Sequence, residues 1–169
     1  MKRWVRSLAA VAILATAVAC DDNEPSSEAI NFTAQLSPAN EVPPVTNAEA
    51  SCSGNTTITM RVNRDAGGAI TSATADFQVS ITGCPVTTAL TQAHIHRGAT
   101  GVAGNVVVDT GLTAGQVVLA GGAGSFTRTG ISVTASLAQE ILSGPSGFYF
   151  NVHSSLNPTG VVRGQLVRQ

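Results

Sequence analysis

The chain has 169 residues, a length that favours a single domain. Its nine basic and ten acidic side chains give a net charge of −1, and the basic ones form no cluster, which excludes the usual electrostatic footprint of a nucleic-acid-binding protein. We therefore expect no nucleic-acid partner.

The N-terminal segment is typical of an export signal. Lys2, Arg3 and Arg6 form a basic start, and a largely apolar run from Leu8 to Ala19 follows. A membrane-spanning helix needs about 20 apolar residues, so this run is too short to cross a bilayer comfortably. We therefore treat residues 1–19 as a secretory signal peptide and exclude them from the fold.

The signal ends in Ala17-Val18-Ala19-Cys20, which resembles the processing box of bacterial lipoproteins. In that family a peptidase cuts before the cysteine, whose thiol carries a diacylglycerol. The resemblance implies that Cys20 is lipidated and anchors an exported chain in the membrane of the bacterial cell envelope, on a periplasmic or outer surface. Residues 20–30 are mostly polar and would form a flexible tether to the domain. An ordinary signal peptide with an unrelated cysteine is the alternative.

The cysteine count agrees with this division. If Cys20 carries lipid, Cys52 and Cys84 remain as a pair, and an exported domain lies in a compartment where disulfides persist. Closing that loop would stabilise the fold by roughly 3–4 kcal/mol in the chain-entropy description. Two free thiols are the alternative.

After Ile30 the composition changes to Val, Thr, Ile, Gly and Ala with few charges. Short alternating runs of such residues, divided by Gly, Asn and Pro, are typical of an all-β sandwich or barrel. We expect strands at residues 31–36, 55–62, 69–82, 91–97, 105–109, 124–129, 147–153 and 161–167.

One segment departs from the strand pattern. Ser136 precedes Gln139 by three residues, the spacing of a capping box, and Gly144 would end the helix that begins there. The prediction is therefore a single Ig-like or Greek-key β-sandwich over residues 31–169, with one short helix before the penultimate strand.

The expected strands carry a polar face with all the histidines of the chain. Residues i and i+2 of a strand lie on one face, so His94 and His96 point the same way while Ala93 and Ile95 point toward the core. The same alternation separates a core face in residues 147–153 from a polar one. If the strands are neighbours, the polar face brings together His94, His96, His153, Tyr149, Asn151, Arg163 and Gln165.

Three motifs resemble those of the CHRD domain, the repeated domain of the animal protein chordin, which also occurs singly in bacterial exported proteins. They are the phrase FTAQLSPANEVPPV at residues 32–45, the phrase AHIH at residues 93–96 followed by Gly98, Gly101 and Gly104, and the phrase FNVH at residues 150–153 followed by Pro158, Gly160 and RGQL at residues 163–166. The resemblance covers residues 31–168 and implies an extracytoplasmic β-sandwich. Chordin antagonises bone morphogenetic proteins, ligands that bacteria lack, so the resemblance implies little chemistry.

A metal site is one interpretation of the polar face. Imidazole is a common ligand for zinc and copper, and His94, His96 and His153 would together supply a three-histidine site with an open position. A His-x-His pattern on a β-sandwich also resembles copper–zinc superoxide dismutase. That enzyme's dinuclear site uses more histidines than this chain has, so we do not expect a dismutase.

A structural hydrogen-bond network that ties the strands together is the other interpretation. The chain has no Gly-x-Ser-x-Gly motif, and we expect no catalytic residues and no enzyme. The sequence thus favours a non-catalytic binding or structural module with a protein or glycan as its ligand, and a copper- or zinc-binding envelope protein is the alternative. We expect Arg97 and Arg163 to be solvated, with an anionic ligand beside the histidines as the alternative.

Overall fold

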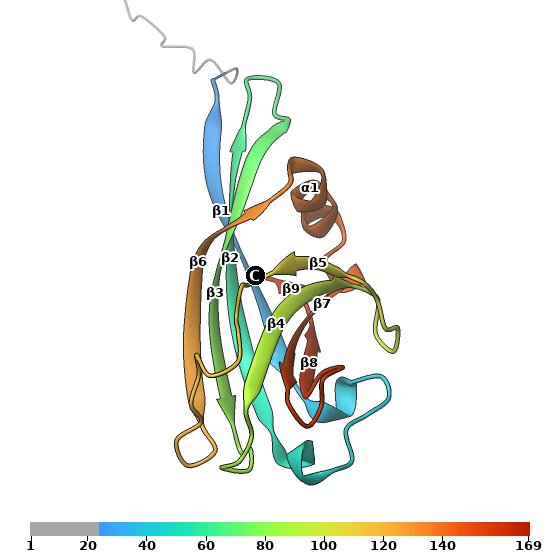
Figure 1. Ribbon diagram of the computed structural model, residues 1–169. Helices are drawn as coiled ribbons and strands as arrows, with labels where there is room; N and C mark the ends of the chain where they lie inside the picture. The colour runs from blue at the N-terminus through green and yellow to red at the C-terminus, as the bar shows by residue number, and fades with distance from the viewer. Residues whose placement is uncertain (1–23) are drawn as a thin grey trace, which may run out of the picture.

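The computed structural model describes residues 24–169, which form two antiparallel β-sheets facing each other (Figure 1). The five-stranded sheet has the order β6-β3-β2-β1-β9 and consists of β1 (Ser26–Leu36), β2 (Ser53–Arg64), β3 (Ile70–Thr82), β6 (Gly124–Val133) and β9 (Val167–Arg168). The four-stranded sheet has the order β5-β4-β7-β8 and consists of β4 (Leu90–Arg97), β5 (Val106–Asp109), β7 (Phe148–Ser154) and β8 (Val162–Gln165). The helices are α1 (Ala135–Ser143) and the short 3-10 turns η1 (Pro38–Asn40), η2 (Ala48–Ser51) and η3 (Pro145–Gly147). The predicted all-β sandwich with one short helix is confirmed.

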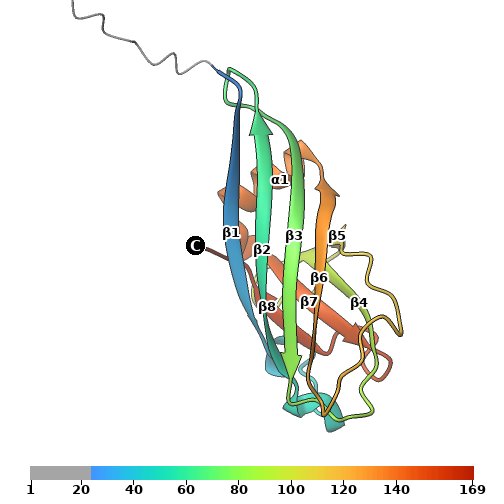
Figure 2. The same cartoon turned by 90° about the vertical axis from the view of Figure 1, so that its left-hand side faces the viewer.

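Alternation along the long strands places the core between the two sheets. In β3 every second side chain is buried, namely Ala73, Ala75, Phe77, Val79 and Ile81. Phe77 meets Phe150 of β7 with ring centroids 5.8 Å apart, which joins the two sheets through apolar contact. Figure 2 shows β1, β2, β3 and β6 side by side, with the second sheet behind them.

The predicted strand at residues 161–167 is divided in the structure. β8 pairs with β7 in the four-stranded sheet, whereas β9 pairs with Phe32 and Thr33 of β1 in the other sheet. Leu166, between them, is 2 % exposed, and its N–H donates to the carbonyl of Phe148. The helix therefore precedes the third strand from the end, because the last predicted strand crosses from one sheet to the other.

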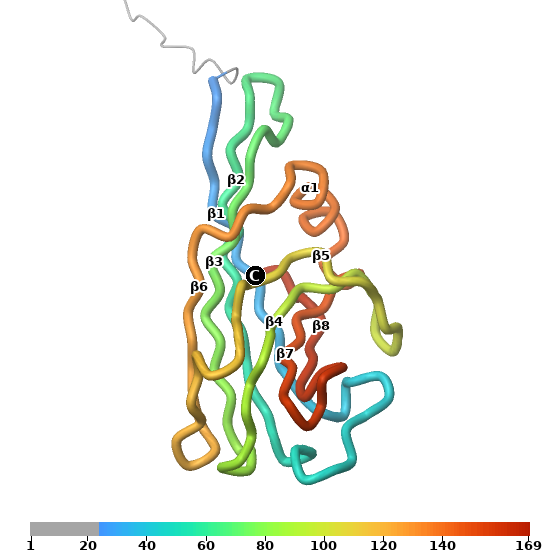
Figure 3. The backbone as a smooth tube through the Cα atoms, viewed as in Figure 1, coloured from blue at the N-terminus to red at the C-terminus, as the bar shows by residue number. Residues whose placement is uncertain are grey.

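The helix starts earlier than predicted. The hydroxyl of Thr134, not Ser136, caps it by accepting from the N–H of Leu137 at 3.3 Å. The reason is that β6 extends to Val133, so the first residue beyond the strand becomes the cap. Figure 3 follows the chain from β6 directly into α1, which contacts β3. None of the helices within residues 24–169 is long and apolar enough to span a bilayer.

The start of the domain is also earlier than predicted. Residues 26–30, expected in the tether, belong to β1, whose register pairs Ser26 with Arg64. The Glu28 carboxylate accepts from Arg64 at 2.7 Å across the same pair of strands. This part of β1 is mostly exposed and is held by backbone pairing, so no apolar pattern indicates it. Cys20 and residues 1–19 lie outside the described residues.

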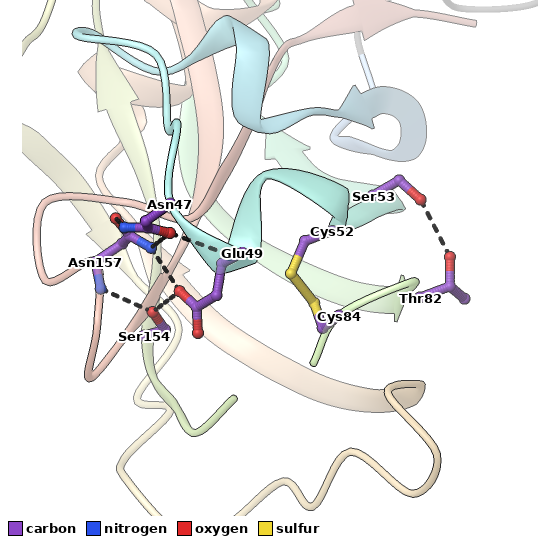
Figure 4. The surroundings of a disulfide bond; sticks show 8 residues. All are labelled: Asn47, Glu49, Cys52, Ser53, Thr82, Cys84, Ser154 and Asn157. Atoms are coloured by element: carbon purple, nitrogen blue, oxygen red, sulfur yellow. Dashed lines mark hydrogen bonds between the residues drawn. A yellow bond between two sulfur atoms is a disulfide. The ribbon is translucent and has the colours of Figure 1, made fainter. Parts of the chain in front are cut away.

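Cys52 and Cys84 form a disulfide, as predicted (Figure 4). Their Cα atoms are 4.3 Å apart, and 32 positions separate them in the sequence. Cys52 follows η2, and Cys84 follows the end of β3, next to the paired residues Ser53 and Thr82. The bond therefore links the segment that contains η2 to the open end of the β2–β3 hairpin, opposite its turn.

Candidate functional site

The three histidines come together on adjacent strands. β4 and β7 pair antiparallel, with His94 opposite Asn151 and His96 opposite Tyr149. His153 lies diagonally from His94, and their ring centroids are 4.9 Å apart, while those of His94 and His96 are 5.5 Å apart. The convergence that the sequence predicts for neighbouring strands is confirmed.

The face that carries the histidines is buried. All residues of β7 are buried, so both faces of this strand are covered. The core takes Phe148, Phe150 and Val152, and the opposite face lies under the loops at residues 41–47, 98–105 and 155–161, which we call the covering loops. His94, His96 and His153 are 5 %, 7 % and 6 % exposed.

The covering loops determine which ring nitrogen carries the proton in two of the three imidazoles. His96 Nδ1 is 2.9 Å from the carbonyl oxygen of Gly104, and His153 Nδ1 is 2.9 Å from the carbonyl oxygen of Pro158. A carbonyl oxygen only accepts, so both Nδ1 atoms must donate. In the neutral rings, Nε2 of His96 and Nε2 of His153 are therefore unprotonated and can act as acceptors.

His94 completes the cluster. Its Nδ1 lies 3.0 Å from Nε2 of His153. Because that Nε2 is an acceptor, Nδ1 of His94 donates to it. Nε2 of His94 lies 3.6 Å from a carboxylate oxygen of Asp109, which faces it from β5.

Burial keeps the imidazoles neutral at pH 7. Desolvation, together with nearby His153 and His96, lowers the pKa of His94 to about 4, against the opposing effect of the Asp109 carboxylate. Desolvation also lowers the pKa of His96 and of His153, although the carbonyl hydrogen bond of each ring raises it. Three uncharged imidazoles thus occupy one small buried volume.

One nitrogen of the cluster has no partner. Nε2 of His96 is buried and makes no hydrogen bond among the described residues. One donor nitrogen from each of His94, His96 and His153 lies within 4.8 Å of the other two. With one proton shared between His94 and His153, the cluster offers unprotonated nitrogens on His96 and His153, and unprotonated imidazole nitrogens are metal ligands.

The predicted polar face surrounds this cluster. Tyr149 stacks on His96 with ring centroids 4.8 Å apart and planes 7° apart, and the guanidinium carbon of Arg163 lies 3.4 Å from the Tyr149 ring centroid. The amide of Gln165 donates to the carbonyl oxygens of Gly98, Ser146 and Phe148. The structure therefore brings all of the predicted polar-face residues together around the histidines.

The two arginines differ from each other. Arg97 is exposed as predicted and pairs with Glu140 of α1. Arg163 was expected to be solvated and is instead 2 % exposed, because residues 99–102 of a covering loop fold over its guanidinium. The expectation was wrong since the loop that covers Arg163 comes from a distant part of the sequence.

Glu41 belongs to the site although no sequence argument singled it out. Both of its carboxylate oxygens accept from the amide of Asn151, at 3.1 and 3.2 Å. Desolvation raises the pKa of Glu41 to about 7, against the lowering effects of Arg163 and of the Asn151 hydrogen bond. The signal that could have indicated it is its place within the first quoted motif, between two prolines and far from other charges.

A second buried carboxylate, that of Glu49, holds the covering loop at residues 155–161 in place. Glu49 accepts from the hydroxyl of Ser154 and from the amide of Asn157, both at 2.5 Å (Figure 4). The Ser154 hydroxyl therefore donates to Glu49 and makes no hydrogen bond with His153. The arrangement holds the loop that carries Pro158 and forms no nucleophile–base pair.

Comparison with known proteins places this site within a recognised domain. The sequence profile described as the CHRD domain matches residues 32–166, a span from β1 to the end of β8 that includes all three histidines. No curated protein and no solved structure matches the chain. Because the matched span covers most of its length, the chain belongs to the CHRD domain family.

Proposed function

We propose that this CHRD domain is a non-catalytic metal-binding module that holds a copper or zinc ion with His94, His96 and His153. The observation that carries the proposal is the buried, unpartnered Nε2 of His96, which lies in the group of three converging imidazoles. A buried acceptor without a partner costs on the order of 1–3 kcal/mol, and a bound cation would remove that cost.

The second partners of the rings support the proposal. Imidazoles that bind a metal through one nitrogen usually donate the other N–H to a backbone carbonyl or a carboxylate, which orients the ring. His96 and His153 already do so, to Gly104 and Pro158. Both rings are neutral, so neither must lose a proton before it binds an ion.

His94 would bind through the same nitrogen that now donates to His153. Its proton would move to Nε2, and the new N–H would face the Asp109 carboxylate, 3.6 Å away. The change is a switch of tautomer, so the ring stays neutral and no proton is released. Asp109 then becomes the carboxylate that orients a metal-bound histidine.

The spacing fits an ion after a small adjustment. Nitrogens about 2.05 Å from a tetrahedral zinc are about 3.4 Å apart, whereas the donor atoms here lie within 4.8 Å of one another. Ring rotations that move each nitrogen by about an ångström or less would bring the three nitrogens to the separation that zinc requires. An all-imidazole set suits zinc and copper and offers no thiolate to distinguish them.

We also propose that the module is exported and anchored in the bacterial cell envelope by a lipid on Cys20. The basic and apolar leader at residues 1–19 and the cysteine that follows it support this. The Cys52–Cys84 disulfide also supports it, because disulfides persist outside the reducing cytosol. Incorporation of labelled palmitate into the chain, and its loss in Cys20→Ala, is the expected result, and equal labelling of both chains would contradict it.

Metal binding can be tested by elemental analysis of the purified full-length chain after equilibration with Cu²⁺ or Zn²⁺ and gel filtration. We expect about one ion per chain in the parent and in Gln92→Ala, and no ion in His96→Ala. Gln92 is an exposed neighbour on β4 and serves as the matched control. No ion in the parent, or the same ion content in His96→Ala, would overturn the proposal.

Nuclear magnetic resonance gives a second readout that does not depend on ion retention. The chain has three histidines, so a long-range ¹H–¹⁵N spectrum contains three imidazole patterns. Zinc should shift the Nε2 signals of His96 and His153 and leave their Nδ1–H signals in place. In a purely structural network, zinc would change none of them, and His153→Ala would only lower stability, by about 1–3 kcal/mol.

A further inference from the structure

Arg163 is a buried cation that forms no ion pair with any described residue. A guanidinium is always charged, and a fully buried one is normally paired. Arg163 is 2 % exposed, yet no carboxylate oxygen within residues 24–169 lies within 4.0 Å of its nitrogens. The Glu41 carboxylate attracts it without pairing with it, and dipoles and the face of the Tyr149 ring supply the remaining balance.

The hydrogen bonds of Arg163 use one end of the guanidinium. Nη2 donates to the carbonyl oxygens of Ala99 and Val102, both at 2.9 Å, and to the side-chain oxygen of Gln165 at 3.3 Å. Nε and Nη1 make no hydrogen bond with any described residue, and neither atom is fully enclosed. Three of the five N–H donors of the group therefore remain free.

Arg163 lines a pocket. Its volume is about 350 Å³, within the range of sites for small molecules. It lies at the seam between the two sheets, where Ser37, just after β1, pairs with Arg163 of β8. Polar but uncharged side chains surround Arg163 there, namely Thr33, Gln35, Asn40, Thr100 and Gln165.

We propose that this pocket binds a small ligand through a carboxylate group that pairs with Arg163. A carboxylate matches the planar donor edge of a guanidinium and carries one negative charge, which equals the one buried positive charge. A phosphate would bring about two charges to a pocket with one cation. The hydroxyl and amide side chains around the arginine suit the remaining polar groups of a sugar acid or of a peptide C-terminus.

This inference does not depend on the metal site. The pocket is lined by none of the three histidines, and the Tyr149 ring lies between Arg163 and His96. Binding can therefore be measured in the presence of a chelator, and the failure of either proposal leaves the other untouched.

The test is a titration of the purified full-length protein, with a chelator present, by glucuronate and by the dipeptide Ala-Ala. Glucose and Ala-Ala amide serve as the matched neutral probes. We expect saturable binding of one carboxylate probe, with movement of the Arg163 Nε–H resonance, and no binding of its neutral counterpart. Binding of glucuronate would identify a sugar acid as the ligand class, and binding of Ala-Ala would identify a peptide C-terminus.

A variant on an exposed residue keeps the test separate from folding. Replacing Arg163 would remove the support of residues 99–102, so the variant is Gln35→Glu, which adds a negative charge at the rim of the pocket. It should weaken binding at least about tenfold by like-charge repulsion. Gln78→Glu, the same change at an exposed position of β3, should not. No binding of either carboxylate at about 10 mM, or equal binding by both variants, would overturn the proposal.

Discussion

Replacing Glu41 by Gln removes the one buried carboxylate that faces the polar cluster while keeping its shape. Glu41 is 7 % exposed and accepts from the amide of Asn151, a bond that the side-chain oxygen of Gln can also accept. Arg163 is the charged group near it, and its attraction is too weak to offset desolvation. The substitution therefore puts a neutral amide in place of a carboxylate whose ionised form is unfavourable at this buried position.

The size and sign of the effect follow from the pKa of Glu41. The pKa is 4.5 for an ordinary glutamate and about 7 in the folded protein. At 1.36 kcal/mol per pH unit, the difference corresponds to about 3 kcal/mol. The folded state binds this proton more tightly than the unfolded state does. The stabilisation by protonated Glu41 is therefore complete below pH 4.5 and is lost as the pH rises through 7.

The assay is urea unfolding of the parent and of Glu41→Gln at a series of pH values from 4.5 to 8.5, with a chelator present. Every other titrating group is common to the two chains, so the difference between their free energies of unfolding isolates Glu41. The free energy of unfolding of Glu41→Gln minus that of the parent should be about 3 kcal/mol larger at pH 8.5 than at pH 4.5. A difference that does not change with pH, or one that changes in the opposite direction, would refute the reasoning.

Three further outcomes test other parts of the structure. Replacing both Cys52 and Cys84 by Ala opens a loop of 32 positions and should lower the free energy of unfolding by about 4 kcal/mol, measured by urea unfolding beside the parent. Gly160→Ala should destabilise the fold by about 2–3 kcal/mol, because its φ is +139° and the new Cβ would overlap the Glu41 carboxylate; an unchanged melting temperature would contradict this contact. In the metal-free Glu41→Gln protein, stability should fall as the pH drops from 6.5 toward 4, with about 3 kcal/mol from His94 alone, since its folded pKa lies below its ordinary value. Constant stability over that interval would show that His94 is not held neutral by burial.

Local periodicity was enough to predict the strands and the faces of their side chains. The alternation of Phe148, Phe150 and Val152 with Tyr149, Asn151 and His153 assigns each residue to a face without knowledge of its neighbours. The His-x-His pattern of β4 places His94 and His96 on one face for the same reason. The disulfide was predicted from the number of cysteines and the inferred compartment.

Contacts made by the covering loops could not be predicted in this way. Glu41 and Asn151 are 110 positions apart, and Arg163 meets the carbonyl of Ala99 across 64 positions. Periodicity describes which side of a strand a residue occupies, but it carries no information about which loop closes over that side. The burial of Arg163 and the raised pKa of Glu41 both follow from such closure.

The sequence by itself thus determined which histidines could come together, because strand geometry repeats every two residues and places the three histidines on faces that can meet. Only the tertiary structure decided that β4 and β7 are neighbours, that carbonyls eight and five positions along the chain hold the protons of two rings, and that one imidazole nitrogen is buried without a partner. The meeting of His94 with His153, which are 59 positions apart, depends on segments brought together from far along the chain, and such long-range contacts turn a pattern of histidines into a candidate metal site.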